Sequence, residues 1–203
     1  MKVFILFTTL VAGASLSPAH AAGRSDPNWP CPQPKVPQMS IAATWDGPPI
    51  ADGSDAWKDN PALKELVVKL AARRTPLDEA KEAVAAFLTG DPTEKQNKAK
   101  RLFASLFDAL NQQRADVIRG IERVDRKQKE LADKIRSDVA ALRELQDKAE
   151  QDQSKINALA GEVEWSIRIF DERRKTIRYV CEVPIVIEQR TFTLARAIRQ
   201  ALE

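Results

Sequence analysis

Apolar residues recur with a single heptad phase over most of the C-terminal half of the chain. The phase runs without a skip from Phe103 to Val180, and 17 of its 23 a and d positions are apolar, against 43% hydrophobic residues in the whole chain. The exceptions are Arg114, Gln128, Asp138, Asp152, Ser166 and Arg173. The other positions carry charges of both signs, as expected of a solvated helix surface. Sustained heptads with charged flanks predict coiled-coil packing.

The long heptad segment has two possible arrangements. One uninterrupted helix from Pro92 to Cys181 would be about 130 Å long, whereas the chain from Cys31 to Asn60 spans about 100 Å at most. The two cysteines could then hardly meet within one chain. We therefore expect the helix to fold back within residues 126–155 and to form an antiparallel hairpin. A continuous rod remains the alternative, because that stretch contains neither Gly nor Pro.

Three short motifs predict where helices begin. Asn60-Pro61, Thr75-Pro76 and Asp91-Pro92 each place an N-cap residue before a proline at the first helical position. Gly90 stands where the preceding helix should end, at a position that favours a left-handed backbone conformation. We expect an all-α bundle built on the long hairpin, with shorter N- and C-terminal helices. Within a helical domain of residues 60–203, the predicted helices are 61–73, 76–89, 92–140, 150–183 and 185–202.

The N-terminus has the pattern of a secretory signal peptide. Residues 1–22 contain Lys2, a short apolar stretch at 3–11 and the small-residue end Ala19-His20-Ala21-Ala22. An uncleaved membrane anchor is the alternative, but the apolar run is shorter than the roughly 20 residues that a spanning helix needs. We therefore predict secretion into the bacterial periplasm.

Residues 23–59 form a proline-rich segment, which we call the arm. Because proline lacks an amide donor, the arm should be extended and ordered mainly by docking on the helices. Trp29, Trp45 and Trp57 recur along it and are the candidate anchors, with partner binding as the alternative role.

Cys31 and Cys181 are the only cysteines. In an oxidising compartment they should form a disulfide. Closing so long a loop would stabilise the fold by about 5 kcal/mol in the chain-entropy description. A redox or metal-binding thiol pair is the alternative, although the chain has no CxxC spacing and no histidine after residue 20.

Composition and motifs exclude several classes of function. A net charge of +3 is too weak for a nucleic-acid footprint. The single histidine, His20, lies in the predicted signal peptide, so the mature chain lacks the residue of catalytic triads and zinc helices. No phosphate-binding, dinucleotide or serine-hydrolase motif is present. We therefore assign no catalytic, cofactor-binding or metal-ligating residue and expect no cofactor.

These observations favour an exported, non-catalytic interaction or scaffold protein of the cell envelope. By overall shape alone, with no shared motif, it is similar to periplasmic holdase chaperones and to coiled-coil adaptors of envelope assemblies. The partner would be an envelope protein or a second copy. The basic C-terminal helix could instead lie on a membrane surface, but a bundle helix is favoured. The alternatives are an envelope enzyme or enzyme subunit using carboxylates, and a helical carrier of an apolar ligand.

Overall fold

The computed structural model describes residues 26–50 and 60–203. In these ranges the chain is all-helical and contains no strand. The helices are α1 (Ile41–Thr44), α2 (Pro61–Ala71), α3 (Leu77–Phe87), α4 (Pro92–Gln146), α5 (Gln153–Val180) and α6 (Val183–Gln200). The all-α prediction is confirmed. The predicted signal peptide, the arm residues 51–59 and Trp57 lie outside the described residues.

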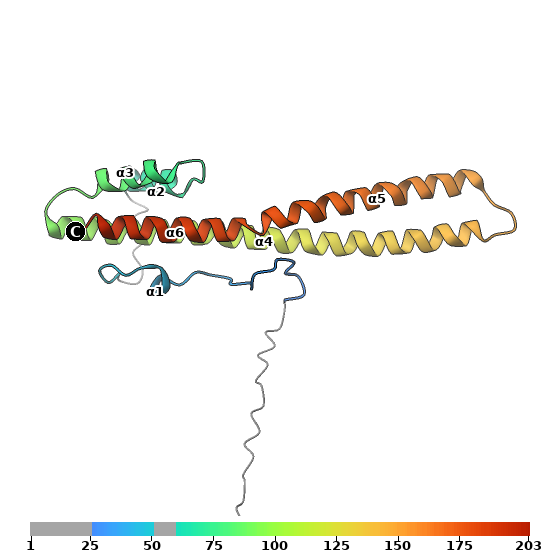
Figure 1. The fold of residues 1–203 in the computed structure, drawn as a ribbon, viewed down its shortest axis with the longest axis horizontal. Helices are drawn as coiled ribbons and strands as arrows, with labels where there is room; N and C mark the ends of the chain where they lie inside the picture. The colour runs from blue at the N-terminus through green and yellow to red at the C-terminus, as the bar shows by residue number, and fades with distance from the viewer. Residues whose placement is uncertain (1–25, 51–59) are drawn as a thin grey trace, which may run out of the picture.

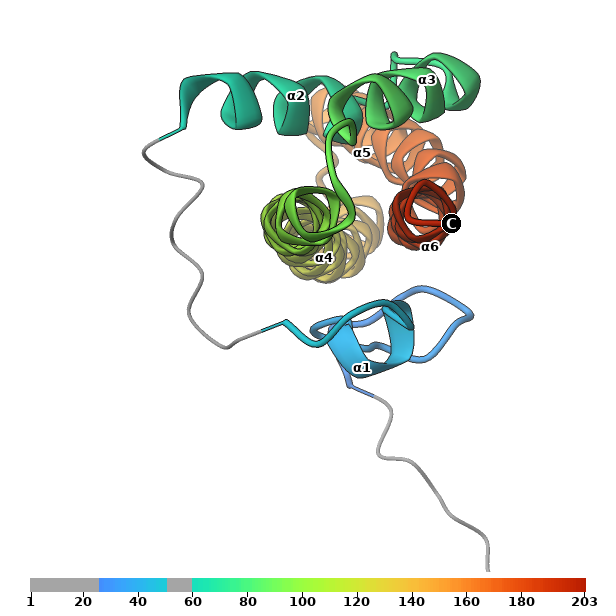
Figure 2. The same ribbon diagram turned by 90° about the vertical axis from the view of Figure 1, so that its left-hand side faces the viewer.

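The main core lies at one end of the molecule, where the short helices gather around α4. α4 packs against α2 and α6, and α3 packs against α6. Figure 2 shows three layers, with α2 and α3 on one side of the α4–α6 pair and the arm with α1 on the other. The largest fully buried side chains of this core include Leu63, Leu70, Leu102, Phe103, Leu106, Leu110, Leu194 and Ile198. The apolar faces of α2, α3, α4 and α6 therefore pack against one another in this core.

The long heptad segment is divided into two helices. α4 has 55 residues, a length of about 80 Å, and ends at Gln146, beyond the predicted end at 140. A turn at residues 147–152 precedes α5, within the stretch 126–155 that we expected to contain it. α5 lies beside the distal half of α4, and α6 beside its first half (Figure 1). The chain is therefore not one uninterrupted rod.

Two of the three predicted helix starts have the expected capping bonds. The side chain of Asn60 accepts from the amide of Leu63 at 3.1 Å, and Asp91 accepts from the amides of residues 93 and 94. The third start was misplaced by one residue, because α3 begins at Leu77 with Pro76 as its N-cap and without a side-chain cap. Gly90 has a positive φ of 117°, as a left-handed residue after α3 requires.

The described arm is not extended throughout. Residues 41–44 form the single turn of α1, which the sequence analysis did not anticipate. Trp45 follows it, and its ring stacks on Phe103 with 4.3 Å between the ring centroids. This contact with the main core holds the arm against α4.

Candidate functional site

The two cysteines join the arm to the junction of α5 and α6. The Sγ atoms of Cys31 and Cys181 lie 2.02 Å apart, at disulfide distance within one chain. Cys31 follows Pro30 in the arm, and Cys181 is the C-cap of α5. Both are buried. This fold brings together two residues 150 positions apart in sequence.

A small second core surrounds the pair, and we call it the cysteine cluster. Its members are Cys31, Ile121, Cys181, Trp29, Val117, Ile177 and Val180. The indole Nε1 of Trp29 donates to the main-chain oxygen of Gln33 at 2.6 Å, and the Gln33 side chain donates to the oxygen of Cys181. The cluster thus fastens the arm to α4 and α5 through apolar contact and hydrogen bonds.

Both described candidate anchors contact the helical body. Trp29 packs in the cysteine cluster, and Trp45 packs on the main core while its Nε1 donates to the oxygen of Pro48 at 2.9 Å. Between them Lys35 forms ion pairs with Asp26 and with Glu122 of α4. The hydrogen bond from Lys35 is the main cause that lowers the pKa of Asp26 below its ordinary value. The arm is therefore held at two aromatic contacts and one charged contact.

Two arginines are buried, and each binds main-chain oxygen atoms far away in the sequence. Arg114, at a polar heptad position, donates to Glu188 of α6 and to the oxygen of Val36 in the arm. Arg190 donates to the oxygens of Leu70 and Thr75. Arg190 lies on the buried side of α6 and is only 7% exposed. Burial lowers its pKa, and the side chain binds one carbonyl in the last turn of α2 and one just before α3.

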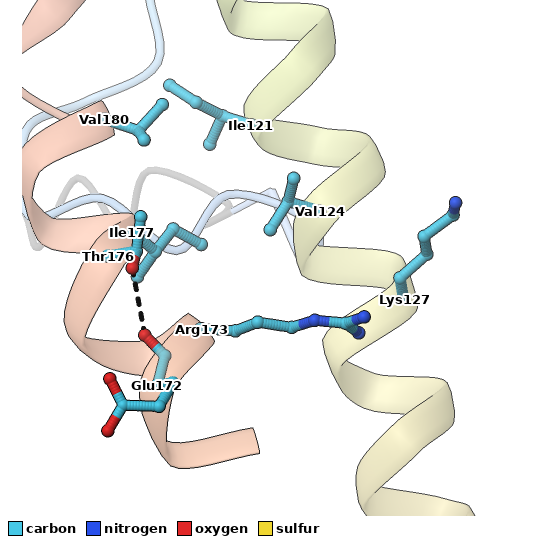
Figure 3. A pocket seen from close by; sticks show the side chains of 8 residues that line it. All are labelled: Ile121, Val124, Lys127, Glu172, Arg173, Thr176, Ile177 and Val180. Carbon is cyan, nitrogen blue, oxygen red and sulfur yellow. Dashed lines mark hydrogen bonds between the residues drawn. The ribbon is translucent and has the colours of Figure 1, made fainter. Parts of the chain in front are cut away.

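An open cleft of about 420 Å³ lies between α4 and α5, next to the cysteine cluster. We call it the α4–α5 cleft. Four aliphatic side chains line it, Ile121 and Val124 from α4 and Ile177 and Val180 from α5. Figure 3 shows the four side chains between the two helices. Ile121, Ile177 and Val180 also belong to the cysteine cluster, so the arm lies behind the cleft.

Charged side chains line one side of this cleft. Lys127 comes from α4, and Glu172 and Arg173 come from α5. Arg173 reaches from α5 across the gap toward α4, below the aliphatic residues in Figure 3. Glu172 accepts a hydrogen bond from Lys175 at 2.9 Å, which raises the pKa of that lysine. Among the described residues, Lys127 and Arg173 form no ion pair.

Sequence reasoning did not identify this cleft. Its one local signal was Arg173, a charged residue at a heptad position that should be apolar. Which residues face Arg173 depends on the position of the turn between α4 and α5, and the heptad pattern does not contain that information. The cleft therefore arises from the way α4 and α5 pair, and the sequence of neither helix alone predicts it.

The described residues provide little for acid–base or metal chemistry. They contain no group of three or more His, Cys, Asp or Glu side chains arranged to hold a metal ion. Asp26 and Asp152 have lowered pKa values, caused chiefly by hydrogen bonds from Lys35 and Lys155. A lowered pKa is opposite to what a carboxylic acid needs to donate a proton near neutral pH.

Comparison of the chain with protein-family models, curated proteins and solved structures finds no match. Within residues 26–50 and 60–203, no helix combines the length and apolar character that crossing a membrane requires.

Proposed function

We propose that the protein is an exported, non-catalytic interaction protein of the bacterial cell envelope. In this proposal the main core and the cysteine cluster form a rigid base, and the distal parts of α4 and α5 form an antiparallel hairpin that contacts a partner. We call residues 122–171 the distal segment. Its role would be that of an adaptor or chaperone-like scaffold.

Side-chain contacts along the distal segment support the antiparallel arrangement. Lys134 of α4 forms an ion pair with Glu162 of α5 at 2.7 Å, and the Gln128 side chain donates to the oxygen of Phe170 at 2.6 Å. As the position on α4 decreases, the partner position on α5 increases. The polar heptad residue Gln128 thus contributes a specific contact between the helices, a use of polar core positions known from coiled coils.

The observation that carries the proposal is the poor burial of the distal segment. α4 has no buried residue after Ile121, and in α5 only Ile156, Val163 and Ser166 are buried. Within the distal segment, two large apolar side chains of α5 are turned outward, with Trp165 59% exposed and Ile167 42% exposed. Exposed tryptophan at the centre of a surface is typical of residues that dominate protein–protein binding. A two-helix segment with such residues is well suited to complete its packing with a partner.

The cysteine pair supports export. A buried pair at disulfide distance is stable in the periplasm or outside the cell, and is rare in a reducing cytosol. It also fastens the base from which the distal segment extends, so that the segment would be presented in a defined orientation.

The enzyme alternative has no observation in its favour among the described residues. The carrier alternative has one, the α4–α5 cleft. Because the cleft is open and small compared with the whole molecule, we treat it below as a site on the scaffold rather than as the main function.

Site-specific photo-crosslinking tests this proposal. A photoreactive amino acid in place of Trp165 should capture a specific protein, or a second copy of this chain, in the envelope of the producing bacterium. The matched control carries the same residue in place of Val68, which is 61% exposed on α2 of the base. Equal crosslinking from both positions, or none from Trp165 in a protein that sediments as a monomer, would refute the proposal.

A further inference from the structure

We propose that the α4–α5 cleft binds a small amphiphile with an apolar chain and a single anionic head group. The end of the chain would lie among Ile121, Val124, Ile177 and Val180, and the anion would be held by Arg173 and Lys127. Ligand binding in the cleft does not require the distal segment to bind a partner protein. An experiment that refutes one of these two proposals therefore leaves the other standing.

The cleft exists because α4 and α5 do not pack tightly against each other at the level of Arg173. Arg173 occupies a heptad position where an apolar side chain would fill the space facing α4. Val124 across the gap is consequently 41% exposed. The resulting volume of about 420 Å³ falls within the range of roughly 300–1,000 Å³ found for small-molecule sites.

The size of the apolar part favours a chain rather than a peptide helix. Ile121 and Val124 lie three residues apart on α4, and so do Ile177 and Val180 on α5. Three residues correspond to a rise of about 4.5 Å. A helix bound in a groove uses anchors spread over i to i+7, about 10 Å. The aliphatic lining is thus too short for a helical partner and suits the end of an alkyl chain.

The charges beside the aliphatic lining select an anion. Glu172 is engaged by Lys175, whereas Lys127 and Arg173 have no ion-pair partner among the residues that the structure describes. The Arg173 side chain crosses the gap toward α4 below the aliphatic lining in Figure 3. Arginine is suited to carboxylates because its planar donors can form two parallel hydrogen bonds. An amphiphile with a cationic head group would be repelled.

The arm would support the site from behind. Ile121, Ile177 and Val180 pack both into the cleft and against the Cys31–Cys181 pair with Trp29. We therefore expect ligand affinity to fall when the pair is reduced, because the aliphatic lining loses its backing. This dependence on the pair distinguishes binding inside the cleft from loose adsorption to the exposed surfaces of α4 and α5.

Calorimetric titration with dodecanoate, below its micelle-forming concentration, tests the proposal on the full mature chain. We expect one molecule bound per chain, at least tenfold weaker binding of dodecyltrimethylammonium, and at least tenfold weaker dodecanoate binding to Arg173→Glu. Val124→Trp should weaken binding by filling the space, and since Val124 is partly exposed this variant should fold. The matched control is Arg126→Glu. Arg126 is exposed and precedes Lys127 in the sequence, and its substitution changes the net charge by the same amount.

Three outcomes would overturn the proposal. One is the absence of dodecanoate binding to the oxidised protein. Another is a loss of affinity in Arg126→Glu as large as that in Arg173→Glu, which would mean general charge attraction. The third is association with phosphatidylglycerol vesicles without binding of monomeric dodecanoate, which would make this face a membrane contact.

Discussion

The guanidinium of Arg190 donates a hydrogen bond to the main-chain oxygen of Leu70, 120 residues earlier in the chain, at 2.7 Å. Leu70 lies in the last turn of α2, where carbonyl groups have no partner inside the helix. A second nitrogen of the same side chain donates to the oxygen of Thr75, just before α3. One residue of the C-terminal helix thus secures both ends of the connection between α2 and α3.

We predict that Arg190→Met lowers the free energy of unfolding by about 2–4 kcal/mol, because two buried carbonyls lose their donors. Urea unfolding followed by circular dichroism measures this change. The control Arg196→Met, on the exposed side of α6, should change stability by less than about 0.5 kcal/mol. Equal effects of the two substitutions would contradict the role that we assign to Arg190.

Two glycine substitutions should act in opposite directions. Gly90 has a φ of 117°, so Gly90→Ala should lower the free energy of unfolding by about 1–2 kcal/mol. Gly161 lies inside α5, and an added Cβ would meet nothing within 4 Å. Gly161→Ala should therefore raise stability by about 0.5–1 kcal/mol. Thermal unfolding of the two variants checks both signs, and a stabilising Gly90→Ala would be inconsistent with the observed backbone.

The contact between Lys35 and Asp26 should respond to acid and to strong base. The pKa of Asp26 is lowered from 3.8, chiefly by the hydrogen bond from Lys35 and then by that from the Asn28 amide. The pair therefore stabilises the docked arm above pH 3.8, and this contribution is lost as the pH falls through the lower folded pKa. The pKa of Lys35 is raised from 10.5, so its contribution is complete below 10.5 and is lost above the folded pKa.

Nuclear magnetic resonance of the Trp29 indole proton can follow this titration. We expect a constant signal between about pH 5 and 9 and a change below pH 3.8. Asp26→Asn should reduce the change on the acid side. An unchanged acid transition in that variant would show that another group causes it.

Local sequence was sufficient where the stabilising contact is local. Asn60 and Asp91 cap helices through bonds to residues two or three positions away, and such caps are visible in the sequence. The start of α5 also has a local signal that we did not use, since the Asp152 side chain accepts from the amide of Lys155 at 3.1 Å. A turn without Gly or Pro could have been placed from this cap.

Long-range contacts account for the remaining differences. Thr75 resembles an N-cap, but it is buried and its carbonyl binds Arg190, so α3 begins one residue later than predicted. The turn of α1 lies next to Trp45, whose place is set by Phe103. The α4–α5 cleft depends on which α4 residues face Arg173. None of these partners can be read from a single segment of the chain.

Removal of the cysteine pair tests how much the pair contributes to the stability of the fold. We predict that replacing both Cys31 and Cys181 with serine lowers the free energy of unfolding by about 3–5 kcal/mol, since a long loop is no longer closed. Urea unfolding without reductant gives this value, and the wild-type protein with reductant should approach it. A stability loss below about 0.5 kcal/mol would mean that the arm is held by its other contacts alone.

The central proposal is that the chain is exported and that its own two cysteines fasten a fold that turns back on itself. Peptide mapping by mass spectrometry, on protein recovered from the periplasm without reductant, tests this most directly. We predict a mature N-terminus after Ala22 and a linked peptide containing Cys31 and Cys181 in the monomer fraction. Free thiols on a chain that still begins at Met1, or a linkage found only in covalent dimers, would contradict the account.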